Sequence, residues 1–287
     1  WEDTLTKYEV AAGTPFQDVV VPTVYTAQFD YMLDLLLTHD KKVLVCGPTG
    51  TGKSCYSQSV LNGKLPETYV SIPVSFSAKT SANMTQDILD AKLDRRRKGV
   101  YGPPAGKKGI VFVDDLNMPE IEAWGAQPPI ELLRNFCDKN STPGGWYDLE
   151  EMTWKTIIDC GLLAAMGPPG GGRNHLTPRF VRHLNLVCFT NFDDNTLKRI
   201  FDTITDWYFT KNGLKFDESV QKKAASVVNA TLDTYRASML NLLPTPLKSH
   251  YTFNLRDFSR VVGGVLTVKP HAGFNDEALV RLWVHES

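Results

Sequence analysis

The stretch VLVCGPTGTGKSCYSQSVL, from Val43 to Leu61, decides the fold of this chain. Its first four residues are apolar and predict a short buried strand, whereas the stretch from Ser54 to Leu61 predicts a helix. Between them, residues 47–54 read GPTGTGKS and fit the pattern GxxxxGK[ST]. Glycines in such a bend let the backbone adopt positive φ and gather N–H groups around an anion. The stretch therefore predicts a phosphate-binding loop at the start of a helix.

Each residue type in this loop has a chemical reason to be there. The ammonium group of Lys53 can reach outer phosphates, and the hydroxyl of Ser54 can ligate Mg²⁺. A glycine turn beside a surface lysine is the alternative, but the strand before the loop and the helix after it favour the phosphate site. The predicted phosphate-binding residues are Gly47, Pro48, Thr49, Gly50, Thr51, Gly52, Lys53 and Ser54.

A second motif, IVFVDD at residues 110–115, places two carboxylates at the end of an apolar strand. Ligands of open α/β sheets bind at the carboxyl ends of the strands. We expect this strand to be adjacent to the one before the phosphate loop. Asp114 would then hold Mg²⁺, and Asp115 would polarise an attacking water. An Asp pair at a strand end is also common turn chemistry, but the phosphate loop upstream favours the site.

The rest of the chain alternates between apolar and helical segments. Strand-like runs fall at 42–47, 69–76, 109–115, 162–167 and 184–189. Helical patterns fall at 29–37, 54–61, 81–97 and 130–140. This alternation predicts an α/β fold, a parallel sheet between helices in three layers.

Two stretches interrupt the alternation. Residues 95–109 form a Gly/Pro loop between basic ends. Residues 139–156 suggest an inserted hairpin with Pro143, Gly144 and Gly145 in the turn and strands around Trp146, Tyr147 and Trp154.

The end of the chain has a different character. Residues 216–243 and 254–268 are helical in pattern, and Asn254 is a suitable helix cap. We therefore predict two domains. The first is a large α/β domain over residues 1–210 with inserted loops near 95–109 and 139–156. The second is an all-helical small domain over residues 211–287.

Composition narrows the partners. The 287 residues carry a net charge of −1, so no strong field attracts nucleic acid or a membrane surface. No apolar run approaches the roughly 20 residues of a membrane span, and no signal segment opens the chain.

The first residue is Trp1, which suggests a piece of a longer chain. The five cysteines show no CxxC spacing, which argues against zinc and fits a reducing compartment.

With both motifs in place, the sequence resembles an AAA+ ATPase module, and in particular the third AAA+ module of an axonemal dynein heavy chain. The resemblance covers nearly the whole chain. It is carried by VVVPT (19–23), GPTGTGKS (47–54), VFVDDLNMPE (111–120), QPPIELLR (127–134), AAMGPPGGGRN (164–174), LTPRFVRH (176–183) and LLPTPLKSHYTFNLRDFSRV (242–261).

The resemblance implies bound ATP or ADP with Mg²⁺. It also implies an adenine pocket lined by Val20, Val21 and Pro22, although valines before a proline are often simply core. Arg256 would be a sensor arginine that reaches the γ-phosphate, unless it only pairs with a carboxylate such as Asp257 at the surface.

Arg179 resembles an arginine finger, with Arg182 as a close rival. Such a finger would act on the nucleotide of the neighbouring module, and this site would borrow its own finger from the next one. Alternatively, both arginines simply form the solvated basic end of a helix.

Two departures from the family pattern bear on catalysis. The family usually places Glu after the magnesium-binding Asp, but this chain has Asp115, which is one methylene shorter. A misplacement of that size can cost about a hundredfold in rate. A polar sensor, commonly Asn, usually ends the strand before the prolines, but Gly167 stands there. Asn191 follows the next strand, too late in the chain for this role. We therefore expect tight nucleotide binding with slow or no hydrolysis.

The expected function is regulatory. Nucleotide state would set the angle between the two domains and gate communication between the main ATPase site of the motor and its microtubule-binding stalk. Expected partners are neighbouring AAA+ modules of the same heavy chain, other dynein chains and, through the full motor, microtubules. The expected location is the cytoplasm, in the cytoskeleton of the cilium or flagellum axoneme. The alternatives are a stand-alone AAA+ remodelling ATPase and a structural ring spacer that binds no nucleotide.

Overall fold

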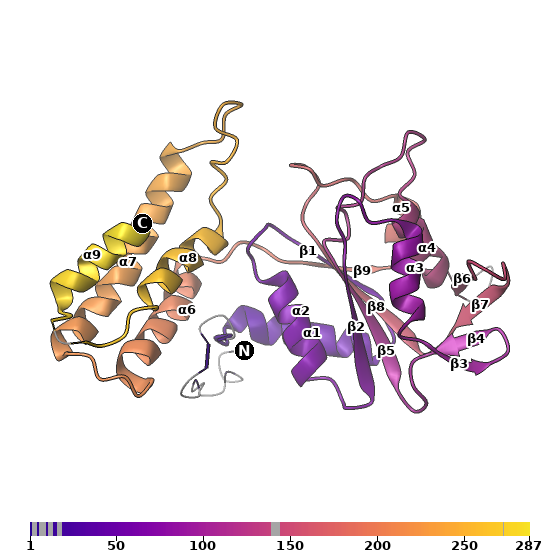
Figure 1. Cartoon of the computed structure of the whole chain (residues 1–287), viewed down its shortest axis with the longest axis horizontal. Helices are drawn as coiled ribbons and strands as arrows, with labels where there is room; N and C mark the ends of the chain where they lie inside the picture. The colour runs from indigo at the N-terminus through magenta and orange to yellow at the C-terminus, as the bar shows by residue number, and fades with distance from the viewer. Residues whose placement is uncertain (2–4, 6–9, 11–13, 16–18, 139–143, 272) are drawn as a thin grey trace. The chain divides into compact units, whose positions relative to one another are not determined.

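A computed structural model gives the fold of the chain (Figure 1). It describes all residues except 2–4, 6–9, 11–13, 16–18, 139–143 and 272. The described residues form two compact units. The α/β unit comprises Phe29–Asn191, and the helical unit comprises Trp1–Gln28 together with Phe192–Ser287. The predicted domain boundary between residues 210 and 211 stays a prediction.

A five-stranded parallel sheet forms the centre of the α/β unit, as the alternating pattern predicts. Its strand order is β2 (Tyr69–Ser75), β5 (Lys108–Asp114), β8 (Cys160–Met166), β1 (Val43–Cys46) and β9 (Asn185–Cys188). In the middle of β1, Val45 pairs with Ala165 on one side and with Val187 on the other. Parallel strands in register bring their carboxyl ends to one edge, which is where the phosphate loop begins.

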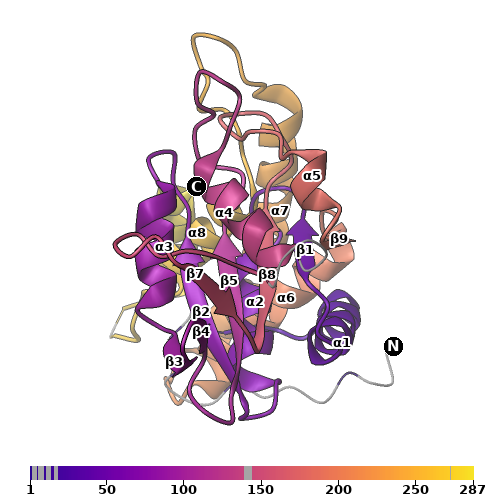
Figure 2. The same cartoon turned by 90° about the vertical axis from the view of Figure 1, so that its right-hand side faces the viewer.

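Helices cover both faces of this sheet, which gives the predicted three layers (Figure 2). One layer contains α1 (Val24–Thr38) and α2 (Lys53–Gly63), and the other contains α3 (Ala82–Asp90), α4 (Pro128–Cys137) and α5 (Pro178–Val181). Successive strand residues point to opposite faces. Leu44 therefore packs into one cluster with Ile130 and Leu133 of α4, whereas its neighbours Val43 and Val45 are buried outside that cluster.

The helix predicted for residues 81–97 is too long. It begins as expected, with Ser81 accepting a hydrogen bond from the Met84 amide, but α3 ends at Asp90. The basic run then forms β3 (Asp94–Arg97), which pairs antiparallel with β4 (Val100–Gly102). The predicted Gly/Pro loop thus contains a strand pair. Its backbone groups are satisfied by cross-strand pairing instead of a further helical turn.

The predicted hairpin is present, but its turn was misplaced. β6 (Gly145–Tyr147) pairs antiparallel with β7 (Trp154–Ile157), so Gly145 lies in a strand and residues 148–153 make the turn. Asp148 holds this turn by accepting hydrogen bonds from the amides of Glu150 and Glu151, both at 2.8 Å. Gly144 directly precedes β6, and Pro143 lies outside the described residues.

The two insertions meet in a second sheet of order β3-β4-β7-β6. β4 and β7 pair parallel to each other although about fifty residues separate them along the chain. The sequence presents these insertions as separate features, whereas the structure joins them.

The helical unit confirms the predicted helical C-terminal region. It contains α6 (Asp194–Asp206), a π-helical segment at Trp207–Lys211, α7 (Glu218–Asn241), α8 (Leu255–Val265) and α9 (Asp276–Glu286). Phe201 of α6 packs on Phe258 of α8 with ring centroids 4.5 Å apart. Asn254 caps α8 as predicted, in a capping box with Asp257.

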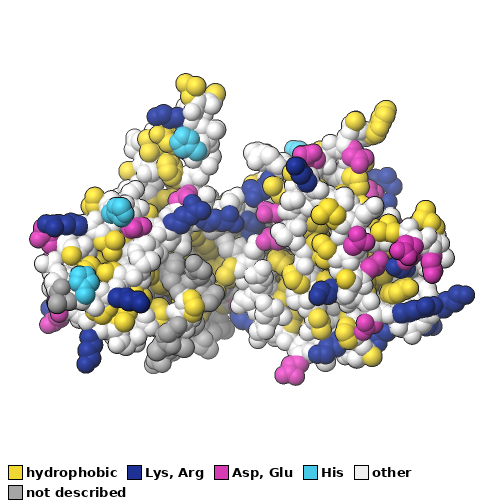
Figure 3. Space-filling model, viewed as in Figure 1, with side chains coloured by type: hydrophobic (Ala, Val, Ile, Leu, Met, Phe, Trp, Pro, Cys, Tyr) yellow, Lys and Arg dark blue, Asp and Glu magenta, His cyan; other side chains and the backbone are white. Residues whose placement is uncertain are grey.

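The segment between α7 and α8 has exposed apolar side chains. Leu243 is 63% exposed and Leu247 is 96% exposed. Figure 3 shows apolar side chains at the tip of this segment. None of the helices in the described part of the chain is both long and apolar enough to cross a bilayer.

Candidate nucleotide site

The loop at residues 47–54 connects the end of β1 to the start of α2, as predicted. Gly47 lies so close to β9 that a Cβ there would be 2.6 Å from the carbonyl oxygen of Phe189. Gly52 has a φ of 77°, in the region that favours glycine, and directly precedes α2. The glycine spacing of the motif therefore has a steric cause, and the loop lies at the positive end of a helix.

Lys53 is held against the loop. Its Nζ donates a hydrogen bond to the carbonyl oxygen of Pro48 at 2.5 Å, and the Thr51 hydroxyl donates to the same oxygen at 2.9 Å. Burial lowers the pKa of Lys53, and the nearby positive charge of Arg173 lowers it further, although Asp114 and Asp115 act in the opposite direction. An anion beside this ammonium group would favour its charged form.

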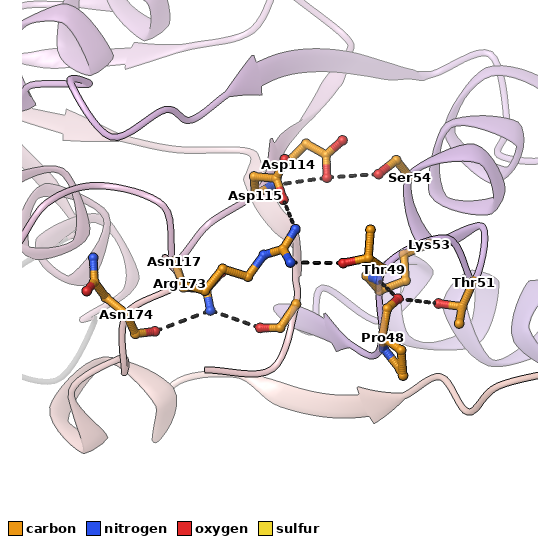
Figure 4. Close-up of polar contacts among 11 residues, drawn as sticks. Pro48, Thr49, Thr51, Lys53, Ser54, Asp114, Asp115, Asn117, Arg173 and Asn174 are labelled. Atoms are coloured by element: carbon orange, nitrogen blue, oxygen red, sulfur yellow. Dashed lines mark hydrogen bonds and ion pairs between the residues drawn. The ribbon is translucent and has the colours of Figure 1, made fainter. Parts of the chain in front are cut away.

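Ser54 and Asp114, the two predicted magnesium ligands, lie together. The Ser54 hydroxyl donates to Oδ1 of Asp114 at 2.9 Å across 60 residues of sequence (Figure 4). The strand that carries Asp114 is not adjacent to β1 as expected, because β8 lies between β1 and β5. Asp114 instead reaches Ser54 on α2. A hydroxyl oxygen and a carboxylate oxygen are the hard ligands that Mg²⁺ prefers, so this pair fits the ion.

Asp115 follows β5 with a φ of 51°, a conformation that Asp tolerates better than most residues. Its carboxylate is 44% exposed and lies 3.2 Å from Nη2 of Arg173. The structure thus places this predicted water-polarising residue beside the phosphate loop, but with its charge already paired to an arginine.

Gly167, at the predicted sensor position, lies directly after β8, and the guanidinium of Arg173 fills the space beside it. A Cβ on Gly167 would lie 2.7 Å from Nε and 2.8 Å from Cζ of Arg173. From this place Nη1 donates to the Thr49 hydroxyl at 2.9 Å, and Nη2 reaches Asp115. In Figure 4 the guanidinium lies between the phosphate loop and Asp115. No role for Arg173 was predicted from the sequence.

Asn117, also without a predicted role, fixes the two loops that carry these groups. Its buried Nδ2 donates to the carbonyl oxygens of Gly167 at 2.9 Å and of Asn174 at 3.2 Å. Asn174 in turn donates to the carbonyl oxygen of Pro119 at 2.7 Å. The loop after β5 is therefore bound to the loop after β8. The signal available in the sequence was that polar residues closely follow both strand ends, in DDLNMPE (114–120) and in GGGRN (170–174).

The remaining predicted residues are spread over both units. Val20, Val21 and Pro22 belong to the helical unit, where Val21 is buried among Phe201, Phe258 and their neighbours. Their assignment to an adenine pocket stays a prediction.

Arg256 also belongs to the helical unit and is exposed on the first turn of α8. Among the described ion pairs, Asp257 pairs with Arg260 at 3.5 Å and not with Arg256. Arg179 and Arg182 are both exposed at the short helix α5 of the α/β unit, on either side of the buried Phe180. The sensor role of Arg256 and the choice between the two possible fingers stay predictions.

A phosphate loop on a parallel sheet, with a Ser–Asp pair suited to Mg²⁺, defines a P-loop ATPase domain. Comparison with known families agrees. Residues 8–192 match the P-loop containing dynein motor region, and residues 209–287 match the ATPase lid domain of the dynein heavy chain. The chain belongs to the dynein heavy chain family and contains an AAA-type ATPase domain of the dynein motor.

Individual relatives are similar over the full length of this chain. It is 49% identical to dynein axonemal heavy chain 12 of Rattus norvegicus and 50% identical to dynein axonemal heavy chain 3 of Homo sapiens. It is 45% identical to dynein axonemal heavy chain 1 of Mus musculus. Each alignment covers 100% of this chain, but only 9%, 7% and 7% of these relatives in the same order. The chain therefore spans less than a tenth of their length.

Proposed function

We propose that this chain is the third AAA+ module of an axonemal dynein heavy chain, and that it binds ATP or ADP tightly but hydrolyses ATP slowly or not at all. The observation that carries the proposal is a contrast within one site. The binding groups Lys53, Ser54 and Asp114 are in place around the loop, whereas Asp115 is engaged by Arg173.

Binding uses groups that the chain itself supplies. The loop amides and the Lys53 ammonium would hold the phosphates, and Ser54 and Asp114 would hold Mg²⁺. The bound ion supplies positive charge that offsets the charge of the phosphate oxygens. Because the Ser54–Asp114 contact joins α2 to β5, filling the site ties the loop to the sheet.

Turnover needs groups that are altered here. Asp115 is shorter than the usual glutamate, and its carboxylate is paired with a cation, which makes it a weaker partner for an attacking water. Gly167 offers no side chain to orient that water. The remaining group, an arginine finger, would come from a neighbouring module, as Arg179 or Arg182 would serve another site in turn.

The proposed role in the motor is regulatory. Bound nucleotide would set the arrangement of a large domain (1–210) and a small domain (211–287), with Arg256 as the sensor between them. This arrangement would gate communication between the main ATPase site and the microtubule-binding stalk. The proposed partners are the neighbouring AAA+ modules, other dynein chains and, through the whole motor, microtubules of the axoneme in a cilium or flagellum.

Binding of labelled ATP with Mg²⁺ to wild type, Lys53→Ala and Lys98→Ala tests the first half of the proposal. Lys98 is an exposed lysine in the β3–β4 turn and serves as the matched control. We expect wild type and Lys98→Ala to bind alike. Lys53→Ala should bind at least about tenfold more weakly, because charge-assisted hydrogen bonds to phosphate are lost. Equal and negligible binding by wild type and Lys53→Ala would instead indicate a structural spacer.

Steady-state hydrolysis by the same three proteins tests the second half. We expect little phosphate release from wild type even at saturating ATP. Brisk turnover that disappears in Lys53→Ala would overturn slow hydrolysis while leaving nucleotide binding intact.

A further inference from the structure

The loop after β8 turns sharply, so that Arg173 lies beside Gly167 at the end of that strand. Gly170, Gly171 and Gly172 have φ values of 121°, 59° and 84°. The amide of Gly170 donates to the carbonyl oxygen of Arg173 at 2.9 Å, and the Arg173 amide donates back to that of Gly170 at 3.1 Å. Asn117 holds the neighbouring backbone at Gly167 and Asn174. Arg173 is therefore carried on a fixed turn.

The absence of a side chain at Gly167 is what admits this arginine. Any Cβ there would come within 3 Å of three atoms of the Arg173 side chain. Gly167 and Arg173 are thus complementary, and a positive charge occupies the place where the family pattern puts a neutral amide.

The guanidinium still has donors to offer. Nη1 contacts Thr49 in the phosphate loop and Nη2 contacts Asp115. Among the residues that the structure describes, buried Nε has no hydrogen-bond partner. A planar fork of N–H donors suits a phosphate better than a single hydroxyl does.

Charge points the same way. Arg173 and Lys53 contact the same loop from different elements, since Arg173 donates to the Thr49 hydroxyl and Lys53 donates to the carbonyl oxygen of Pro48. Two half-buried cations beside one loop repel each other, and an anion between them relieves that repulsion. Asp115, which is 44% exposed, offsets only part of this charge.

We propose that Arg173 is a phosphate-binding residue of this module's own nucleotide site. It takes the terminal phosphate of ATP and lets the site distinguish ATP from ADP with an arginine from the same chain. The proposal rests on the proposed function, since it requires that the loop binds nucleotide. It adds that the preference for the triphosphate comes from a cation in the place of the missing sensor side chain.

Calorimetric titration of MgATP and of MgADP into wild type, Arg173→Gln, Arg173→Lys and Arg97→Gln tests this. Arg97 is exposed on β3 and serves as the matched control. Arg173→Gln should weaken ATP binding at least about tenfold while changing ADP binding by less than about threefold, because only the terminal phosphate loses a charge-assisted bond. Arg173→Lys should restore part of the preference, since it keeps the charge but loses the fork. Arg97→Gln should match wild type.

The outcomes separate the two proposals. A wild-type chain that binds neither nucleotide would overturn the proposed function. A wild type that binds while Arg173→Gln keeps its ratio of ATP to ADP affinity would overturn the role of Arg173 alone. Equal weakening of both nucleotides would also overturn it, because a purely structural arginine has no reason to single out the third phosphate. Circular dichroism of each variant shows whether the fold is kept, and Arg173→Lys supplies the affinity ratio if Arg173→Gln does not fold.

Discussion

Position 167 shows how a missing side chain changes what a neighbouring residue can do. In the sequence, Gly167 indicates that a sensor side chain is missing, because a glycine cannot orient a water. In the structure the same glycine makes room for a guanidinium that contacts Thr49 and Asp115. Under the two proposals above, the site exchanges a group that serves hydrolysis for one that serves binding.

Gly167→Ala tests this exchange without touching a charge. The new methyl group would lie 2.7 Å from Nε of Arg173, so the flexible arginine must move, and stability should change little. We expect the ratio of ATP to ADP affinity to fall in the direction expected for Arg173→Gln. The Gly167→Ala/Arg173→Gln double variant should show no further loss, because both changes act on one group. Gly63→Ala, where a Cβ meets nothing within 4 Å, is the control. Fully additive losses in the titrations would contradict the shared mechanism.

At this scale the sequence predicts the residues that belong to a motif. Lys53, Ser54 and Asp114 lie where the pattern of loop, helix and strand end requires. Arg173 and Asn117 were not predicted, because their positions depend on the course of a glycine-rich turn and on which strands are neighbours. Neither the signs of φ at Gly170–Gly172 nor the position of β8 between β1 and β5 can be read from residue types.

At the scale of the elements, the β6–β7 hairpin is attached to the rest of the α/β unit through the indole of Trp146. Trp146 is 2% exposed, packs on Phe136 of α4 with ring centroids 6.0 Å apart, and donates its Nε1–H to Asp90 at 3.0 Å. The hairpin is thereby attached to α3 and α4 together. The strands around this residue were predicted from the sequence, but the turn was placed too early. Adjacent glycines such as Gly144 and Gly145 favour a turn prediction even where, as here, one of them lies in a strand.

Trp146→Ala should therefore destabilise the α/β unit by about 3–5 kcal/mol, the usual cost of removing a large buried aromatic side chain. Chemical denaturation followed by circular dichroism measures this. Trp124→Ala removes the same side chain from a position that is 94% exposed and should cost less than about 0.5 kcal/mol. If both substitutions have equal effects, the hairpin is not anchored through Trp146.

The failed prediction at 95–97 has a different cause. The run Asp94–Arg97 is all charged, with no apolar alternation to indicate a strand. It becomes a strand only because β4 is available as a partner, and β4 in turn pairs with β7. Pairing between distant segments is a tertiary effect that local residue preferences do not contain.

At the scale of the whole molecule, the N-terminal segment is the part whose place was least apparent from the sequence. Val21 stands 22 residues before β1, yet it packs in the core of the helical unit with residues of α6 and α8. The helical C-terminal region itself was predicted, because its periodicity is local. The contribution of the N-terminal segment to that unit was not predicted, because its sequence pattern does not indicate which element it packs against.

Val21→Ala should weaken the helical unit by about 2 kcal/mol, since it removes buried methyl groups from that core. Hydrogen exchange should then speed up at amides of α6 and α8 and stay unchanged at β1 and β8. Val43→Ala, at the buried start of β1, is the reciprocal control and should show the opposite pattern. Faster exchange in both units from either substitution would mean that they unfold as one.

The parallel pairing of β4 with β7 has a practical consequence for protein engineering. Anyone who shortens this module by deleting only residues 145–157 would leave the edge of β4 open, with bare amides and carbonyls ready to recruit another molecule. The two insertions have to be removed or kept together, even though β5 and α4 separate them along the chain.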